Sequence, residues 1–466
     1  MGTGSTTDEI ARYCVEASTA DLPEEVRERL KQHLLDFVGV VLGGREHAGS
    51  SPAVERAVRT LSGADAAAEA TVLPTGERRS AEHAALLNGT FAHSLDFDDT
   101  HRGSSLHPGA PVIPAALAVA EREGATTEAL LAAVAAGYDV TCTLGRAANP
   151  DAHYARGFHV TATCGTFGAA AAAGVVAGLD AEGFASAFGV AGSQAAGSLQ
   201  FLANGAWNKR LHPGLAARRG VTAAALAAAG FRGAARPVEG DHGFLAGYTD
   251  DPDYAAFERL GVDHAVTETA LKPYPCCRYM HAAIDALLEL SGEVDPADVS
   301  SVAVDLPRSG VTLTGEPIAA KRRPENVVDC QFSMPFAAAL ALTRGEAGLP
   351  AFLDAGSRLD DPDLRRLMDA TDVRTTDEVQ SRFPDQWAAR VVVEADETYE
   401  RFVETARGEP ERPLGWDGVA AKFDAVGRSV GLSEGRRAEI VEVVRTLESR
   451  ELADLTGALR GAEPDR

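Results

Sequence analysis

The sequence predicts a mainly α-helical protein in which a large all-helical domain is interrupted by a smaller α+β domain. Ala-rich helical patterns, broken by Gly and Pro, fill the first part of the chain and leave no run of alternating strands. Further along, Val-rich or alternating runs typical of strands occur at 300–306, 389–395 and 399–405. Helical patterns then return. We therefore expect a helical domain of residues 1–268 and 408–466, with an α+β domain of residues 269–407 inserted between its two parts.

The helices are placed by the spacing of their apolar residues. In 23–44, apolar side chains recur at helical spacing from Val26 to Val41, after Pro23 and before two glycines. The same spacing predicts helices near 80–95, 110–122, 127–147, 160–178, 183–198 and 215–229. In the rest of the chain it predicts helices near 279–292, 331–343, 359–369, 416–431 and 434–459.

One segment has to be weighed as a membrane span. Residues 157–179 contain no Lys, Arg, Asp or Glu. Their side chains are mostly Ala, Gly and Thr, which are too weakly apolar for insertion into a bilayer. We interpret the segment as a tightly packed buried helix and expect no membrane association.

The charge balance argues against a nucleic acid partner. The chain has 68 acidic and 44 basic residues, a formal net charge of −24, which repels phosphates and anionic membranes. The six cysteines form no CxxC pair, and the sequence starts without a basic and apolar leader. We expect a reduced, cytoplasmic protein.

The motifs that carry chemistry are four polar clusters, at 96–121, 155–165, 207–220 and 271–281. The signatures of P-loops, dinucleotide-binding folds, zinc proteases and α/β-hydrolases are missing from the sequence. Only five of the basic residues are lysines, and two of these, Lys209 and Lys272, fall inside two of the clusters. That coincidence favours a shared function over four unrelated loops.

Each cluster also has a purely structural interpretation. His107 could belong to a turn before a helix, and Asp98 and Asp99 could be capping or salt-bridged loop acids. Arg156 and His159 could simply satisfy backbone carbonyls.

The stretch NGTFAHSLDFDDTH (88–101) raises a choice between a metal site and a proton-transfer site. His93, Asp96 and His101 could supply metal ligands. Alternatively, a carboxylate and an imidazole could act beside cations that neutralise substrate carboxylates, and Lys209, Lys272, Arg156 and Arg278 are the candidate cations. We favour the second interpretation, a lyase or isomerase of polycarboxylic acids with no cofactor and no metal.

Five motifs in this order resemble those of the MmgE/PrpD family: NGTFAHSLDFDDTH, HPGAPVIPAALAVAE, RGFHVTATCGTFGAAAAAG, NKRLHPGLAARRG and KPYPCCRYMHAAIDA. The family includes 2-methylcitrate dehydratases, cis-aconitate decarboxylases and an iminodisuccinate epimerase. The resemblance covers roughly residues 8–460. It implies a helical domain built from both ends of the chain, a smaller α+β lid domain, a homodimer, and a metal-free site between the domains.

The resemblance also assigns site residues. The proposed catalytic residues are Asp96, His107, His159, Lys209 and Lys272. The proposed substrate-binding residues are Thr100, Arg156, His212, Cys277, Arg278 and His281.

Two departures from the family pattern bear on the reaction. Cys277 stands where the decarboxylase branch is expected to have a His, which argues against decarboxylation of cis-aconitate. The loop HRGSSL, residues 101–106, replaces a bulkier Trp-containing loop of the propionate-pathway dehydratases. These departures leave the substrate open.

The leading hypothesis is a cofactor-free dehydratase of a hydroxylated di- or tricarboxylate such as 2-methylcitrate or citrate. Lys209, Lys272 and His159, together with Arg278, would hold carboxylates, and Thr100 would hydrogen-bond the substrate. His107, oriented by Asp96, would exchange the proton on the carbon next to a carboxylate. The alternatives are a decarboxylase or epimerase of a related acid, such as cis-aconitate or iminodisuccinate, and a polyacid-binding protein without catalysis.

Overall fold

The computed structural model describes residues 5–63 and 67–460 of the chain. The chain divides into two compact units. Unit 1 comprises Met1–Ala270 and Gly415–Arg466, and unit 2 comprises Leu271–Leu414. The predicted mainly helical fold is confirmed. That unit 2 serves as a lid stays a prediction.

A buried helix forms the centre of unit 1. Helix α8 (Val160–Val176) packs against α5 (Gly109–Glu123), α6 (Thr127–Ala147) and α10 (Asn208–Ala228). All of its residues from Val160 to Val175 are buried, and most are Ala, Gly or Thr. Because small side chains let helices approach closely, the uncharged segment is a packed core helix, as predicted.

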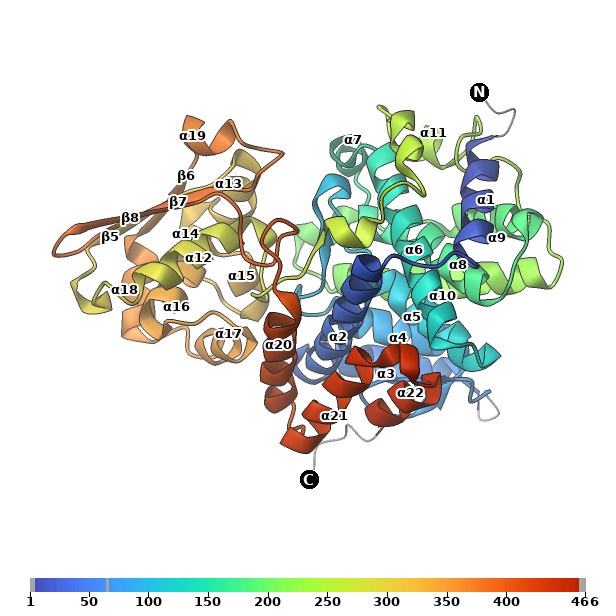
Figure 1. The fold of residues 1–466 in the computed structure, drawn as a ribbon. Helices are drawn as coiled ribbons and strands as arrows, with labels where there is room; N and C mark the ends of the chain where they lie inside the picture. The colour runs from blue at the N-terminus through green and yellow to red at the C-terminus, as the bar shows by residue number, and fades with distance from the viewer. Residues whose placement is uncertain (1–4, 64–66, 461–466) are drawn as a thin grey trace. The chain divides into compact units, whose positions relative to one another are not determined.

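The two parts of unit 1 meet along one long helix. Helix α2 (Glu24–His47) packs against α4 (Ala81–Ala92) and, from the C-terminal part of the chain, against α20 (Gly415–Ser429). Figure 1 shows α2 in blue beside α20 in red. Residues nearly 400 positions apart therefore share one core.

The remaining elements of unit 1 are shorter. Two small antiparallel pairs join β1 (Ala70–Thr71) to β2 (Arg78–Arg79) and β3 (Thr100–His101) to β4 (Thr269–Ala270). The other α-helices are α1 (Thr6–Ala17), α3 (Ser51–Leu61), α7 (Pro150–Ala155), α9 (Ala181–Gln194), α11 (Phe244–Tyr248), α21 (Glu434–Arg445) and α22 (Leu452–Arg460).

Unit 2 is built on a four-stranded sheet of order β6-β5-β7-β8. Its strands are β5 (Ser301–Asp305), β6 (Thr371–Arg374), β7 (Ala389–Glu394) and β8 (Thr398–Val403). β5 runs parallel to β6 and antiparallel to β7, which pairs antiparallel with β8.

Helices of unit 2 pack on this sheet and complete its core. Those that contact it are α12 (His281–Leu290), α13 (Arg308–Thr314), α16 (Met334–Arg344) and α18 (Pro362–Ala370) (Figure 1). The others are α14 (Ile318–Lys321), α15 (Val327–Gln331), α17 (Leu349–Gly356) and α19 (Asp377–Gln380).

Three predicted helix boundaries were wrong. Helix α10 begins at Asn208 rather than near 215, although Pro213 and Gly214 suggested a turn. The pattern at 183–198 ends at Gln194, and the pattern at 434–459 is two helices separated by a break. The glycine of α10 serves close packing, because a Cβ at Gly214 would overlap the Thr90 hydroxyl of α4.

Within residues 5–63 and 67–460, no helix combines the length and apolar character needed to cross a membrane.

Candidate active site

The loop between α4 and α5 carries a group of buried polar side chains. It contains β3 and a 3₁₀ turn (Arg102–Ser104), and most of its residues are buried. Asp96 adopts a left-handed backbone conformation with φ of 52°, which an Asp tolerates better than most residues. This turn separates the side chain of Asp96 from those of Asp98 and Asp99, which have other partners.

Asp98 lies between two imidazoles. Its Oδ2 atom is 2.8 Å from Nδ1 of His93 and 3.3 Å from Nδ1 of His107. The two rings lie edge to face with centroids 4.6 Å apart. The backbone N–H of His107 donates to the hydroxyl of Thr161 in α8 at 3.2 Å, which fixes the base of this side chain.

The electrostatics of this group keep Asp98 ionised. Burial alone would raise its pKa, but His107 and His93 outweigh burial and hold the pKa of Asp98 well below its usual range. An ionised carboxylate only accepts hydrogen bonds, so Nδ1 of His93 carries the proton. Burial lowers the pKa of His93 to about 4, which leaves this imidazole neutral near pH 7.

Two further histidines extend the cluster. Nδ1 of His159 lies 3.1 Å from Nδ1 of His212, and the ring of His159 lies 5.9 Å from that of His93. Burial, reinforced by neighbouring positive and imidazole groups, lowers the pKa of His159 well below its usual value and that of His212 to about 4. We call His93, His107, His159 and His212 the histidine cluster. Three of its members, His93, His159 and His212, offer neutral donors and acceptors in a site largely closed to water.

A cation stands at the loop beside this cluster. Nζ of Lys209, in the first turn of α10, lies 2.8 Å from Oδ1 of Asp96. The Lys209 side chain is 24% exposed and that of Asp96 only 8%. The lysine can therefore be reached from solvent, as a residue that binds an anionic substrate has to be.

Thr100 supplies a buried hydroxyl in the same loop. Its Oγ1 atom is enclosed and has no hydrogen-bond partner among the described residues. Buried polar atoms are normally paired, so a hydroxyl left in this state is suited to a bound ligand.

Asp99 has a supporting role behind the loop. Its carboxylate accepts from the Tyr138 hydroxyl at 2.6 Å and from the N–H of Gly109 at 3.1 Å, and it lies 3.1 Å from Nδ1 of His33. These contacts anchor the loop to α2, α5 and α6. Both acids thus have partners within the protein, but only the partners of Asp98 are the imidazoles of the histidine cluster.

The structure corrects three expectations about individual residues. The carboxylate beside His107 is Asp98, whereas Asp96, expected in that position, pairs with Lys209. His101 was weighed as a metal ligand together with His93, but its ring contacts Ser104 and Arg146 instead. His93, weighed from the sequence as a metal ligand, lies between His107 and His159 in the histidine cluster.

Arg156 is not brought into the cluster. Its guanidinium pairs with Asp250, and it also donates to the carbonyl of Gly247 at 2.6 Å. The side chains of both charged partners are substantially exposed. This ion pair is a surface contact within unit 1.

The remaining predicted site residues belong to unit 2. Lys272, Cys277, Arg278 and His281 are all buried there. Arg278 forms a two-point ion pair with Glu409 and lies over the ring of Trp387, so its charge already has a structural use. Nε2 of His281 lies 3.3 Å from the carbonyl oxygen of Cys276.

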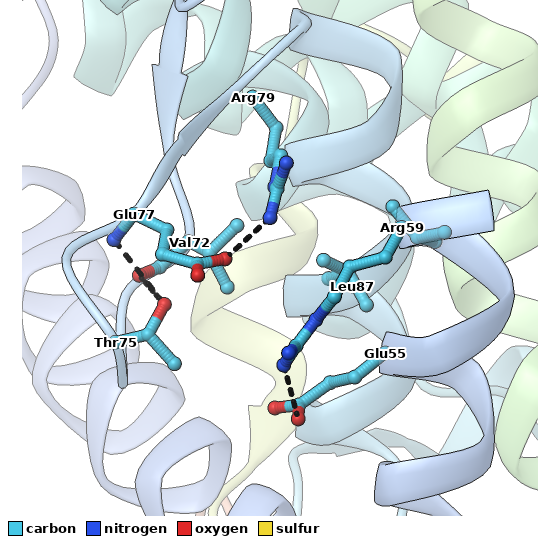
Figure 2. A pocket seen from close by; sticks show the side chains of 8 residues that line it. Glu55, Arg59, Val72, Thr75, Glu77, Arg79 and Leu87 are labelled. Atoms are coloured by element: carbon cyan, nitrogen blue, oxygen red, sulfur yellow. Dashed lines mark hydrogen bonds and ion pairs between the residues drawn. The ribbon is translucent and has the colours of Figure 1, made fainter. Parts of the chain in front are cut away.

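A pocket elsewhere in unit 1 is not a substrate site. It lies between α3, α4 and the β1–β2 pair and is lined by residues such as Glu55, Arg59, Glu77 and Arg79 (Figure 2). Its volume of about 10 Å³ has room for about one water molecule. Two ion pairs join its own lining residues, Arg79 to Glu77 and Arg59 to Glu55.

Comparison with known proteins gives matches over nearly the whole chain. Residues 8–256 match the MmgE/PrpD N-terminal domain, and residues 274–448 match the MmgE/PrpD C-terminal domain. A cis-aconitate decarboxylase-like protein of Aspergillus oryzae is 28% identical over 483 aligned residues, which cover 98% of each protein.

Two further relatives carry related names. The cis-aconitate decarboxylase of Aspergillus terreus is 26% identical over 97% of this chain and 95% of its own length. The human cis-aconitate decarboxylase is 27% identical over 82% of this chain and 80% of its own length.

Proposed function

Because the chain belongs to the MmgE/PrpD family, we propose that it is a lyase acting on a polycarboxylic acid by proton transfer at a carbon next to a carboxylate. The observation that carries this proposal is the contact of Asp98 with His107, close to the partly exposed cation of Lys209. A carboxylate-oriented imidazole can hold or move a proton, and a lysine can neutralise a carboxylate of the substrate.

The preferred reaction is decarboxylation of an unsaturated tricarboxylate of the cis-aconitate type. In such a step the bond between carbon and the departing carboxylate breaks, and its electron pair moves through the double bond to a carbon that takes up a proton. His107 is the proposed proton donor. The relatives named above support this choice over dehydration, which the sequence alone had favoured.

The histidine cluster suits that chemistry. A carboxylate leaves more readily as carbon dioxide when it is desolvated, and the neutral imidazoles of His93, His159 and His212 would replace water without adding charge. Lys209 would hold a carboxylate that stays on the product. The hydroxyl of Thr100 is proposed to hydrogen-bond the substrate.

Dehydration of a hydroxylated di- or tricarboxylate is the second candidate. It is favoured by Cys277, which stands where the decarboxylase branch is expected to have a His. The two reactions share proton transfer beside a carboxylate, so the same cluster could serve either one.

Turnover assays decide between these candidates. Purified protein is incubated separately with cis-aconitate, citrate, 2-methylcitrate and iminodisuccinate, and product mass, carbon dioxide and ultraviolet absorbance are followed. Release of carbon dioxide from cis-aconitate supports the preferred reaction, and loss of water from a hydroxy acid supports the second. Turnover of none of these acids, or activity that EDTA abolishes and a divalent ion restores, contradicts the proposed metal-free lyase.

Two further proposals concern the substrate-binding residues of unit 2 and the oligomeric state of the protein. From the resemblance of its motif we propose that Lys272 binds a substrate carboxylate, and that Cys277, Arg278 and His281 shape the same site. We also propose a homodimer. Light scattering after size-exclusion chromatography measures its mass, and a monomer at micromolar concentration would contradict it.

A further inference from the structure

Three side chains of the loop after α4 are arranged like a metal-binding set. His93, Asp98 and His107 each offer a ligand atom, and these atoms all lie within 4.8 Å of one another. Two imidazoles and a carboxylate form a donor set that suits Zn²⁺ and neighbouring transition-metal ions better than Mg²⁺ or Ca²⁺.

The same residues have unused bonding capacity. Nε2 of His93, Oδ1 of Asp98 and Nδ1 of His107 are enclosed and have no aligned hydrogen-bond partner among residues 5–63 and 67–460. His93 and Asp98 are 2% and 3% exposed, so bulk water does not reach their unpaired atoms to form hydrogen bonds. Buried polar atoms without partners point to a ligand that binds among them.

The spacing is close to that of a metal site. In a tetrahedral zinc site with bonds of about 2.0–2.1 Å, neighbouring ligand atoms lie about 3.3 Å apart. Oδ2 of Asp98 lies 3.3 Å from Nδ1 of His107 and 2.8 Å from Nδ1 of His93. The shorter separation has to open by about half an ångström, and any separation near the 4.8 Å limit of the set has to close by about 1.5 Å.

The charge around the set also accepts a cation. Asp98 contributes a negative charge, and the nearby Lys209 is already paired with Asp96. The fourth coordination position would take water or an oxygen of an acidic ligand, as in other three-ligand zinc sites.

We propose that a divalent transition-metal ion binds to His93, Asp98 and His107 and inhibits the lyase by taking the atoms that proton transfer requires. The inhibitory part rests on the proposed function, whereas the binding part does not. The site would make the reaction sensitive to the concentration of free zinc.

Binding is tested directly on the full chain after removal of metal with a chelator. Zn²⁺ is titrated by calorimetry, and Co²⁺ is titrated by visible absorption, which reports four-coordinate cobalt. We expect one ion per chain. Asp98→Asn, His93→Gln and His107→Gln should each weaken binding by about 100-fold or more.

The control is His33→Gln. His33 also contacts a buried carboxylate, Asp99, at 3.1 Å, but without a second imidazole in the set. Its affinity for Zn²⁺ should equal that of the wild type. Thermal unfolding checks that each variant is folded, and His107→Gln is the ligand variant whose side chain is most exposed, so it is the safest substitution. Binding that is absent, or that all three ligand variants retain, overturns the site.

Activity assays test the inhibitory part. One equivalent of Zn²⁺ should abolish turnover, and EDTA should restore it. Zinc that binds with full activity retained overturns inhibition, and activity that depends on the ion overturns both inhibition and the metal-free lyase. If none of the acids is turned over, the proposed function fails, while the titrations still decide whether the site exists.

Discussion

Nζ of Lys209 lies 2.8 Å from Oδ1 of Asp96, and this ion pair joins the first turn of α10 to the loop after α4. The lysine is the more exposed partner, and the aspartate is held in a left-handed turn. A substrate carboxylate that approaches this loop can therefore meet the lysine while Asp96 keeps the ammonium group in place.

Replacement of Lys209 by Met should remove the cation without adding bulk. We expect kcat/KM to fall about 1000-fold, because loss of one partner of a hydrogen-bonded charge pair with the substrate, desolvated in the complex, costs about 2–5 kcal/mol. Steady-state kinetics measures the change. Lys31→Met is the matched control, since Lys31 pairs with Glu28 and Glu448 in the contact of α2 with the C-terminal segment. Wild-type kcat/KM in Lys209→Met would contradict a role in substrate binding.

Replacement of Asp98 by Asn should act mainly on kcat. The amide keeps the shape of the side chain but no longer stabilises positive charge on His107 or fixes the Nδ1 proton of His93. We expect kcat to fall by about 100- to 10,000-fold with little change in KM. The pH profile provides a second measurement, because a change in its acidic limb reports an altered imidazole. A change in KM alone would assign Asp98 to binding rather than to proton transfer.

The sequence predicted the main helices and drew attention to Lys209, each for a physical reason. Apolar periodicity over twenty residues, as in α2, is a strong signal, and scarce lysines made Lys209 stand out. The sequence could not predict which partner each aspartate of this loop contacts. Asp96, Asp98 and Asp99 lie within four consecutive residues, and no sequence pattern reports the left-handed backbone at Asp96 that reverses the chain between them.

The start of α10 shows a second limit. A His-Pro-Gly sequence is typical of a turn, yet here Pro213 and Gly214 lie inside the helix. The space at Gly214 is fixed by Thr90 and Leu86 of α4, more than a hundred residues away. Packing between distant segments therefore overrides the turn preference of the His-Pro-Gly sequence. A local sequence pattern contains no information about such packing.

Acid should destabilise the protein in a window set by its buried histidines. Burial lowers the pKa values of His93, His153 and His212 to about 4. The unfolded chain therefore binds more protons than the folded chain between about pH 6.5 and 4, so stability is lost as the pH falls through this window. Each histidine contributes a slope of up to about 1.4 kcal/mol per pH unit.

Urea denaturation at several pH values between 7 and 4 measures this loss. Of the three titrating groups, His153 is the one outside the histidine cluster, so His153→Gln should flatten the slope while the cluster stays intact. Asp98 contributes in a different window. Because its folded pKa is lowered, its stabilisation is complete above its usual pKa near 4 and is lost only at lower pH. An unfolding free energy that stays constant from pH 7 to 4 would contradict neutral buried histidines.

Lys422 of α20 should stabilise the fold and position the loop that carries Asp98. Its ammonium group lies 2.6 Å from Asp36, donates to the carbonyl of Phe97 at 2.8 Å, and lies 3.8 Å from the centre of the Phe97 ring. Lys422 and Asp36 are both nearly inaccessible. Lys422→Met leaves a buried carboxylate without its cation, so the free energy of unfolding should fall by about 3–5 kcal/mol.

A double variant separates two effects of Lys422, its ion pair with Asp36 and its contact with Phe97. Burial raises the pKa of Asp36, and Lys422 opposes that rise. The buried carboxyl group of Asp36 therefore destabilises the fold only when the lysine has been removed. Lys422→Met with Asp36→Leu should therefore recover most of the lost stability in urea denaturation. Its kcat should remain below that of the wild type, because the carbonyl of Phe97, the residue before Asp98, has lost its donor. Recovery of both stability and kcat would show that Lys422 acts only through Asp36, whereas recovery of neither would place its effect in packing against Phe97.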